Sequence, residues 1–195
     1  MEKLILARHA ESVFNVRGVL NGNPRNAGGL SARGVAQAEL LSDLLAEVDI
    51  DLCVTTDFDR TRETADIVLR DRDVPRLIVP ELNDPPCGRF ELRPYAEYLE
   101  WRIENGPDVA LPGETMTERE CVAEIARAFE ALIARPERTV LAILHGFCIG
   151  WMLGSVARDT RQEAGFAKPH RLSKQEIERA LDEVRDDLYR YLSVP

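Results

Sequence analysis

Two of the chain's three histidines lie directly after short apolar runs. His9 follows residues 4–7 and the adjoining Arg8, and His145 follows the run at residues 139–144. Such runs are typical of buried strands, and ligands of open α/β sheets bind beyond the carboxyl ends of the strands. The pattern therefore predicts that both imidazoles reach one binding site at the same edge of a sheet.

The residues around these histidines favour phosphoryl chemistry. A neutral imidazole is a competent nucleophile near neutral pH, because its reference pKa is about 6.5. Attack on a phosphoryl group needs cations around the non-bridging oxygens. Arg8 adjoins His9, and Arg60, with Arg62 two residues on, begins a predicted helix. A guanidinium matches phosphate oxygens bidentately, and a helix start adds N–H donors. His145 can then donate a hydrogen bond to the same oxygens.

The elements that must position these residues alternate along the chain. Strands are predicted for the short apolar runs at residues 4–7, 52–55, 76–79 and 139–144. Ser31 is placed to cap a helix, whose expected apolar stripe comprises Ala36, Leu40, Leu41, Leu44, Leu45 and Val48. This alternation predicts a three-layer α/β/α sandwich with a mostly parallel central sheet. The continuous apolar run at 139–144 suits a central strand covered on both faces.

Two further predicted helices complete the alternation of strands and helices. One is predicted over residues 60–69, and Thr117 with Glu120 forms a capping box for another. Its apolar stripe comprises Val122, Ile125, Ala126, Phe129, Leu132 and Ile133. We expect all of residues 1–195 to form one domain, since this length can bury one sizeable core.

Two segments fall outside the alternation. Residues 80–113 are rich in proline and aromatic residues and too long for an ordinary connection, so they predict either a lid or a helical insertion packed on the rim. Residues 173–192 predict a C-terminal amphipathic helix that docks on its own domain. Its stripe comprises Ile177, Leu181, Val184, Leu188 and Tyr191. His170, between these elements, is interpreted as part of an exposed linker.

Composition narrows the range of partners. With 34 acidic and 25 basic residues the net charge is −9, which disfavours nucleic acid and anionic membranes. The four cysteines lack the short paired spacing of a zinc site, and no run is long enough for a membrane span. The sequence predicts a cytoplasmic protein with a small phosphorylated substrate and no cofactor, and a homo-oligomer remains compatible with it.

The chain resembles the histidine phosphatase superfamily, in its phosphoglycerate-mutase-like branch. Residues 8–12, Arg-His-Ala-Glu-Ser, resemble the Arg-His-Gly-Glu-Thr/Ser signature. The resemblance continues in the family's order through further segments: Asn15, Gly18, Asn21, Gly22, residues 30–38, 60–65, 112–115 and 145–146. Residues 60–65 match an Arg-Ala-x-Gln-Thr-Ala segment, which assigns the pocket arginine to Arg60 and not Arg62. No motif covers the chain beyond Arg158.

The resemblance implies a covalent phosphohistidine mechanism. His9 would attack phosphorus, a carboxylic acid would protonate the leaving alcohol, and water would then cleave the phosphohistidine. The residues implied to hold the phosphoryl oxygens are Arg8, Asn15, Asn21, Gly22, Arg60 and His145. No metal is implied, because arginines and histidines supply the positive charge.

Two positions depart from the family pattern. Ala10 replaces a glycine after the nucleophile, which fits only if its φ is negative. Asp84 stands where the family has a glutamate as proton donor, and an aspartate is one methylene shorter and about 0.4 pKa units more acidic. Glu81 is a nearby substitute for the acid, and an aspartate before two prolines is also typical of a turn.

The sequence therefore predicts a metal-independent phosphomonoester hydrolase that acts through His9. Asp84, His145, Arg8 and Arg60 are the other expected catalytic residues. Two alternatives stay open: a cofactor-dependent phosphoglycerate mutase, and a non-catalytic module that binds phosphate but has lost the acid. The substrate itself is not determined by the sequence.

Overall fold

The core of the fold is a five-stranded sheet of order β3-β2-β4-β1-β5. In the computed structural model, which describes residues 1–154, 166–167 and 169–182, four of these strands are parallel and β5 is antiparallel. The strands are β1 (Lys3–Arg8), β2 (Leu52–Thr55), β3 (Arg76–Ile78), β4 (Thr139–Leu144) and β5 (Pro169–Ser173). The apolar β4 occupies the central position, as its sequence predicts.

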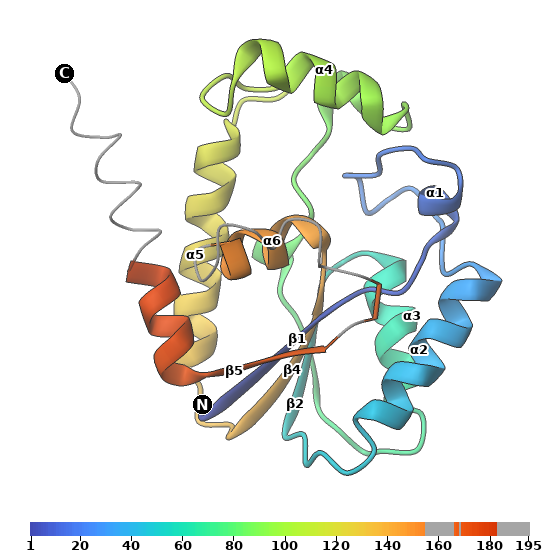
Figure 1. The fold of residues 1–195 in the computed structure, drawn as a ribbon, viewed down its shortest axis with the longest axis vertical. Coiled ribbons are helices and arrows are strands. Elements are labelled where there is room, and N and C mark those ends of the chain that lie inside the picture. The colour runs from blue at the N-terminus through green and yellow to red at the C-terminus, as the bar shows by residue number, and fades with distance from the viewer. Residues whose placement is uncertain (155–165, 168, 183–195) are drawn as a thin grey trace.

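Helices cover both faces of this sheet (Figure 1). On one face, α2 (Ala32–Leu44) and α3 (Asp59–Val68) pack against alternate strand residues such as Ile5, Cys53 and Leu141. On the other face, α5 (Glu118–Ile133), α6 (Gly146–Gly154) and the helix at residues 174–182 pack against the intervening ones, such as Leu6 and Ala142. The predicted α/β/α sandwich is therefore confirmed.

The helix starts follow the predicted capping residues, but one predicted stripe is partly wrong. Ser31 caps α2 by accepting the Gly34 N–H, and Thr117 and Glu120 form the predicted capping box of α5. In α2, however, Leu40 and Leu44 are 60% and 53% exposed. The buried face of this helix instead comprises Gly34, Ala38, Leu41 and, just beyond it, Leu45. Gly34 lets α2 approach the loop after β1, because a Cβ there would collide with the Glu11 carbonyl oxygen, and the two leucines lie outside this buried face.

The C-terminal part corrects a second interpretation. His170 is not in an exposed linker but in β5, where it pairs with Leu6 of β1. Pro169 is the first residue of this edge strand, a position that tolerates proline. The predicted C-terminal helix is present over residues 174–182, with Ile177 and Leu181 buried. Its expected continuation to residue 192 lies outside the described residues.

Residues 80–113 form two short 3-10 helices, η1 (Pro80–Leu82) and η2 (Gly88–Phe90), and the helix α4 (Tyr95–Asn105). None of the α4 residues is buried, and α4 lies at the same end of the molecule as α1 (Val13–Val16) (Figure 1). Backbone hydrogen bonds join the loop before α4 to the loop after α1: Leu20 donates to the Arg93 carbonyl, and Leu92 donates to the Leu20 carbonyl.

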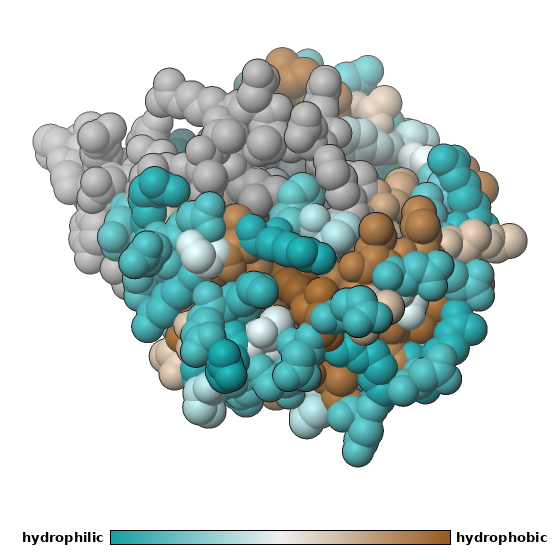
Figure 2. All heavy atoms as spheres, turned by 60° about the horizontal axis from the view of Figure 1, so that its bottom comes forward, coloured by the Kyte–Doolittle hydropathy of each residue, from teal (hydrophilic) through white to brown (hydrophobic). Residues whose placement is uncertain are grey.

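The opposite end of the sheet is turned forward in Figure 2, which shows apolar side chains in the middle of a face whose rim is mostly polar. In the part of the chain that the structure describes, no helix combines the length and apolar character needed to cross a membrane.

Candidate active site

His9 lies at the carboxyl end of β1, where the strand delivers it into a buried pocket. Its backbone N–H donates to the Leu144 carbonyl at 2.8 Å, and only 2% of the residue is exposed. Its Nδ1 lies 2.7 Å from the Ala10 carbonyl oxygen. A carbonyl can only accept, so Nδ1 carries the proton and Nε2 keeps its lone pair. The imidazole is therefore held in the tautomer that a nucleophilic Nε2 requires.

The backbone after His9 is fixed from α3. The Ala10 N–H donates to Thr64 Oγ1 at 3.0 Å, and the Thr64 hydroxyl donates to the Arg60 carbonyl at 2.6 Å. Ala10 does not have a positive φ, so the alanine is accommodated where the family signature has glycine. The strand end and the helix start thus hold the His9 segment together.

Arg60 is the centre of the pocket, and it lies in the first turn of α3. Its Nε donates to His9 Nε2 at 3.2 Å, and its guanidinium stacks 4.0 Å from the Phe58 ring centroid. Arg62, in contrast, is exposed and pairs with Asp59 at 2.6 Å. The structure therefore brings Arg60, and not Arg62, to His9, as the motif assigns. Burial, with the charges of Arg60, His145 and Arg8, lowers the pKa of His9 well below its usual value.

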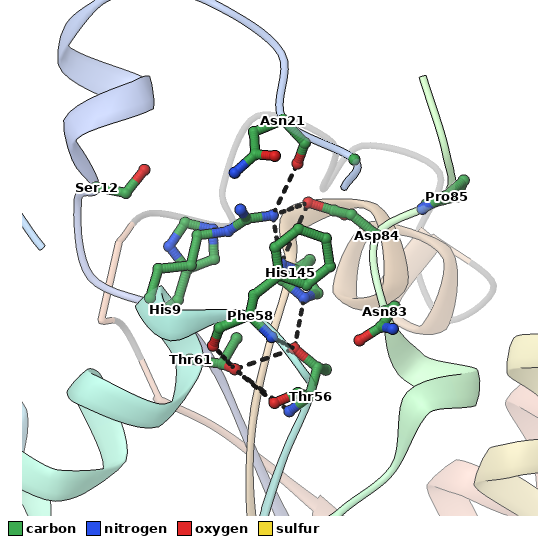
Figure 3. A network of polar contacts seen from close by, with 12 residues as sticks. His9, Ser12, Asn21, Thr56, Phe58, Thr61, Asn83, Asp84, Pro85 and His145 are labelled. Carbon is green, nitrogen blue, oxygen red and sulfur yellow. Dashed lines mark hydrogen bonds and ion pairs between the residues drawn. The ribbon is translucent and has the colours of Figure 1, made fainter. Parts of the chain in front are cut away.

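His145 enters the same pocket from the end of β4. Its ring centroid lies 5.4 Å from that of His9 in an edge-to-face arrangement. Its Nδ1 lies 3.1 Å from Arg60 Nη2, and its Nε2 lies 2.9 Å from Thr56 Oγ1. Burial is the main cause that lowers its pKa below the usual value, and the nearby Asp84 opposes this shift. The two predicted histidines therefore meet around one guanidinium (Figure 3).

Asp84 reaches this cluster from the loop after η1. Its Oδ2 lies 2.8 Å from Arg60 Nη2 and 3.2 Å from His145 Nδ1. Burial alone would raise the pKa of Asp84, but the charge and hydrogen bond of His145, with the charge of Arg60, hold it well below its usual range. Glu81 is exposed and lines a groove between β3 and α5, with Glu124 and Arg127 of α5. Of the two candidate acids, only Asp84 lies beside His9.

Arg8 lies against Gly146 and Phe166. Its guanidinium carbon is 4.2 Å from the Phe166 ring centroid, and a Cβ on Gly146 would lie 3.2 Å from that carbon. Phe166 also contacts the His9 ring, with centroids 6.0 Å apart. The glycine after His145 therefore lets the Arg8 guanidinium pack closely against the backbone at the start of α6.

The three loop residues predicted to bind phosphate, Asn15, Asn21 and Gly22, form no side-chain or N–H hydrogen bond with His9 among the described residues. Asn15 forms a capping box with Ser12, and its Oδ1 accepts from the Ser12 hydroxyl at 2.8 Å. Asn21 contributes its backbone carbonyl, which accepts from Arg60 Nη2 at 3.2 Å. The Gly22 N–H already donates to Glu91 Oε2 at 3.0 Å, so the structure does not bring this donor to His9. Gly22 instead allows close packing, because a Cβ there would lie 2.4 Å from the Pro85 carbonyl oxygen.

Several residues of the pocket have no counterpart in the sequence predictions. They are Thr56, Phe58, Thr61, Thr64, Glu91 and Phe166. Thr56 directly follows β2, so the reasoning that selected His9 and His145 at strand ends would also have selected it. Thr61 and Thr64 lie within the matched segment 60–65, but that match assigned a role only to Arg60. Phe58, Glu91 and Phe166 contact residues far away in the sequence, so no local signal marks them.

The assembled site has the chemistry of an anion receptor with a nucleophile at its centre. Two guanidiniums and a second imidazole surround a neutral His9, and a carboxylate lies opposite. Burial raises the pKa of both nearby thiols, Cys87 and Cys148, so neither is a thiolate at neutral pH. His9 is therefore the only strong nucleophile that the described residues bring into this pocket.

Comparison with known proteins agrees with this geometry. The adenosylcobalamin/α-ribazole phosphatase of Escherichia coli is 37% identical over 103 residues, which are 53% of this chain and 50% of that protein. In this comparison the match therefore spans about half the length of the relative. A probable phosphoglycerate mutase of Proteus mirabilis is 28% identical over 165 residues, covering 80% of this chain and 75% of that protein.

Solved structures share the fold. The crystal structure of the α-ribazole phosphatase from Shigella flexneri is 25% identical and aligns with a TM-score of 0.73 over 87% of this chain and 89% of that one. The sequence model of the histidine phosphatase superfamily (branch 1) matches residues 4–181, which extends beyond the last motif recognised in the sequence. With the match covering nearly the whole chain and two histidines meeting around Arg60, the protein belongs to the histidine phosphatase superfamily.

Proposed function

We propose that the protein hydrolyses phosphomonoesters through a phosphohistidine formed on Nε2 of His9. The observation that carries the proposal is the contact of His9 Nδ1 with the Ala10 carbonyl at 2.7 Å, which leaves a lone pair on Nε2. That lone pair faces Arg60 at 3.2 Å, where a bound phosphoryl group would lie. The lowered pKa keeps the ring neutral at neutral pH. The nucleophile is therefore prepared before substrate arrives.

In the first step, Nε2 forms a bond to phosphorus while the ester P–O bond breaks. Arg8, Arg60 and His145 would bind the non-bridging oxygens, whose charge they oppose. Asp84 would give its proton to the leaving oxygen. In the second step, Asp84 would take a proton from water as the water oxygen attacks phosphorus. The P–N bond then breaks, and inorganic phosphate leaves.

This sequence requires Asp84 to change its protonation state when substrate binds. In the free protein, Asp84 is a carboxylate held by Arg60 at 2.8 Å and His145 at 3.2 Å. A phosphate dianion would compete for both partners, and a carboxylate that loses its cations beside a dianion gains proton affinity. Substrate binding would thus convert Asp84 from an ion-pair partner into a general acid. A proton taken up on binding is the signature of this step.

The segment at residues 80–113 would act as the lid over this site. It carries Asp84, and α4 presents apolar side chains to solvent, with Ile103 75% exposed and Leu99 42% exposed. These side chains would contact the organic part of a substrate. The names of the relatives put α-ribazole phosphate first among the compounds to test, followed by smaller alkyl phosphates.

The test is to trap the intermediate. Wild-type protein mixed with a labelled phosphomonoester and quenched in base should carry an acid-labile, base-stable phosphoryl group on His9. His9→Ala should carry none and should lose turnover, whereas His170→Gln, in which the histidine of β5 is replaced, should retain the label. A label on Ser12 or on a cysteine would contradict the mechanism.

The mutase alternative is tested by product analysis. The protein is supplied with 3-phosphoglycerate and a catalytic amount of the 2,3-bisphosphate, and both 2-phosphoglycerate and free phosphate are followed. We expect phosphate release to dominate, because water needs no binding site of its own. Isomer formation well above phosphate release would support the mutase, and no turnover even of p-nitrophenyl phosphate would support a non-catalytic module.

A further inference from the structure

We propose that Thr56 and Thr61 are positioning residues for His145. Their two hydroxyls form a hydrogen-bond chain in which the direction of donation can reverse. One direction satisfies the neutral imidazole and the other satisfies the imidazolium. The inference rests on the proposed function, in which His145 binds phosphoryl oxygens.

The chain of hydroxyls is continuous and buried (Figure 3). Thr56 Oγ1 lies 2.9 Å from His145 Nε2 and 3.0 Å from Thr61 Oγ1. Thr61 Oγ1 in turn lies 2.8 Å from the Phe58 carbonyl oxygen. Thr56, Thr61 and His145 are each 0% exposed, so bulk water does not reach these hydrogen bonds.

The contacts of His145 Nδ1, on the opposite side of the ring from Thr56, assign the tautomer of the neutral imidazole. Arg60 Nη2 has two hydrogens but three neighbours: the Asn21 carbonyl at 3.2 Å, Asp84 Oδ2 at 2.8 Å and His145 Nδ1 at 3.1 Å. The two oxygens can only accept, whereas Nδ1 can donate. Every contact is satisfied if Nδ1 carries a hydrogen and donates it to Asp84 at 3.2 Å. The neutral ring then has its lone pair on Nε2, facing Thr56.

The hydroxyls can match this tautomer. For neutral His145, Thr61 donates to Thr56, and Thr56 donates to Nε2. Thr61 Oγ1 then still accepts from the Thr56 N–H at 3.3 Å. The Phe58 carbonyl keeps the Thr61 N–H at 3.1 Å, so no buried group loses its last partner.

The same hydroxyls also match the cation after both rotate. Nε2–H then donates to Thr56 Oγ1, Thr56 donates to Thr61, and Thr61 donates to the Phe58 carbonyl. His145 can therefore gain a proton without leaving a buried polar atom unpaired. The charged groups that face the ring are Asp84, Arg60 and Arg8, with the rings of His9 and Phe58 beside it. When phosphate replaces Asp84 at Nδ1, its greater negative charge would favour the cation, and the hydroxyl chain permits it.

A valine at position 56 separates this role from packing alone. It preserves shape but presents a methyl group to Nε2, and an unpaired buried N–H costs the cation more than an unpaired lone pair costs the neutral ring. Thr56→Val should therefore weaken binding of inorganic phosphate by about tenfold, the size expected for a hydrogen bond to a charged group. Thr56→Ser should restore it. Thr55→Val is the matched control, because Thr55 is the buried preceding residue and no side-chain hydrogen bond is found for it among residues 1–154.

The readout is the ¹⁵N chemical shift of the imidazole nitrogens in the full chain, which has only three histidines. Free wild-type protein should show a proton on Nδ1 and a lone pair on Nε2 of His145, and phosphate should protonate Nε2. In Thr56→Val, protonation of Nε2 in the phosphate complex should require a pH at least one unit lower. His9→Gln and His170→Gln assign the remaining ring signals.

Each outcome decides the matter. If neutral His145 in the wild-type protein carries its proton on Nε2, the inference is overturned. This test needs no variant, so it holds even if Thr56→Val fails to fold. Unchanged phosphate affinity in Thr56→Val, failure of serine to rescue, or an equal effect of Thr55→Val would also overturn it. Neither readout depends on turnover. A protein with the expected shifts but no hydrolysis would refute the proposed function alone.

Discussion

The Asp84 carboxylate lies 2.8 Å from the Arg60 guanidinium, which also donates to His9 Nε2 at 3.2 Å. In the proposed mechanism, a substrate phosphoryl oxygen would replace this carboxylate beside Arg60. The positive charge of the free site is partly neutralised, because the Asp84 carboxylate pairs with one of its two guanidiniums. Arg60 is buried, and a buried guanidinium without a partner would be costly. The ion pair with Asp84 therefore stabilises the empty pocket. When substrate binds, Arg60 would exchange this carboxylate for the phosphoryl group.

The first prediction concerns the leaving group. Asp84→Asn should slow hydrolysis of an alkyl phosphate by about 10²–10⁴-fold, the usual contribution of general acid catalysis. It should slow p-nitrophenyl phosphate far less, because a nitrophenolate leaves without a proton. The measurement is kcat for both substrates. Glu81→Gln is the control and should leave both rates unchanged, since Glu81 lines the groove beside α5 and not the pocket. A selective loss in that variant would instead assign the acid to Glu81.

The second prediction concerns stability and pH. The pKa values of His9 and His145 are lowered in the folded protein, mainly by burial. Below about pH 6.5 the unfolded chain binds protons on these rings that the folded chain does not. The free energy of unfolding should therefore fall as pH decreases from 6.5, by up to about 1.4 kcal/mol per pH unit for each ring.

Urea unfolding at closely spaced pH values between 5 and 7 measures this slope. His9→Asn removes one of the two groups, so its slope should be smaller by up to one proton. An identical slope in wild type and His9→Asn would show that the folded protein protonates His9 as readily as the unfolded chain does.

The third prediction concerns metals. Arg8, Arg60 and His145 supply the positive charge that a divalent cation provides in other phosphatases, so exhaustive chelation should leave activity intact. Vanadate, which can adopt the five-coordinate geometry of the transition state, should inhibit. Loss of activity on chelation with recovery on added Mg²⁺ would contradict the proposed role of the arginines.

The fourth prediction concerns the loop that carries the acid. Gly22→Ala would place a Cβ 2.4 Å from the Pro85 carbonyl oxygen and 2.8 Å from Cys87 Sγ, so the loop must move and take Asp84 with it. We expect a loss of about 1–3 kcal/mol in stability, typical of overpacking, and lower kcat for alkyl phosphates. Gly150→Ala in α6 is the control, because a Cβ there meets nothing within 4 Å and the helix gains a better helix former. Equal effects of the two substitutions would refute the steric argument.

The elements predicted correctly are those whose signals are local. The apolar run of β4, the Ser31 cap and the box of Thr117 with Glu120 each depend on a few neighbouring residues, and each agrees with the structure. The polar β5 was missed because an edge strand needs no apolar run, and only its pairing with β1 makes it a strand. In α2, the choice between leucines depended on which face approaches the sheet.

The site divides in the same way. Motifs and strand ends selected His9, Arg60, Asp84 and His145, which the structure brings together. Phe166 could not be selected, since its contacts with Arg8 and His9 depend on how distant segments pack. Thr61 lies in the matched segment 60–65, but its link through Thr56 to His145 is seen only in the structure. Gly22 was selected as a phosphate ligand because a motif match does not show why a residue type is needed at a position. In the structure, a glycine is needed there for close packing against the Pro85 loop.

The place of β1 between β4 and β5 also constrains when the protein can fold during its synthesis. Residues 3–8 pair with residues 139–144 and 169–173, so the strand that carries His9 has no partner until most of the chain has been translated. At about 5–20 residues per second, that delay is roughly seven to thirty seconds. During it, both edges of this apolar segment are unpaired, and unpaired strand edges of an incompletely folded chain promote aggregation. Translation arrested before residue 139 would therefore yield a chain that contains the nucleophile but cannot assemble the pocket around it.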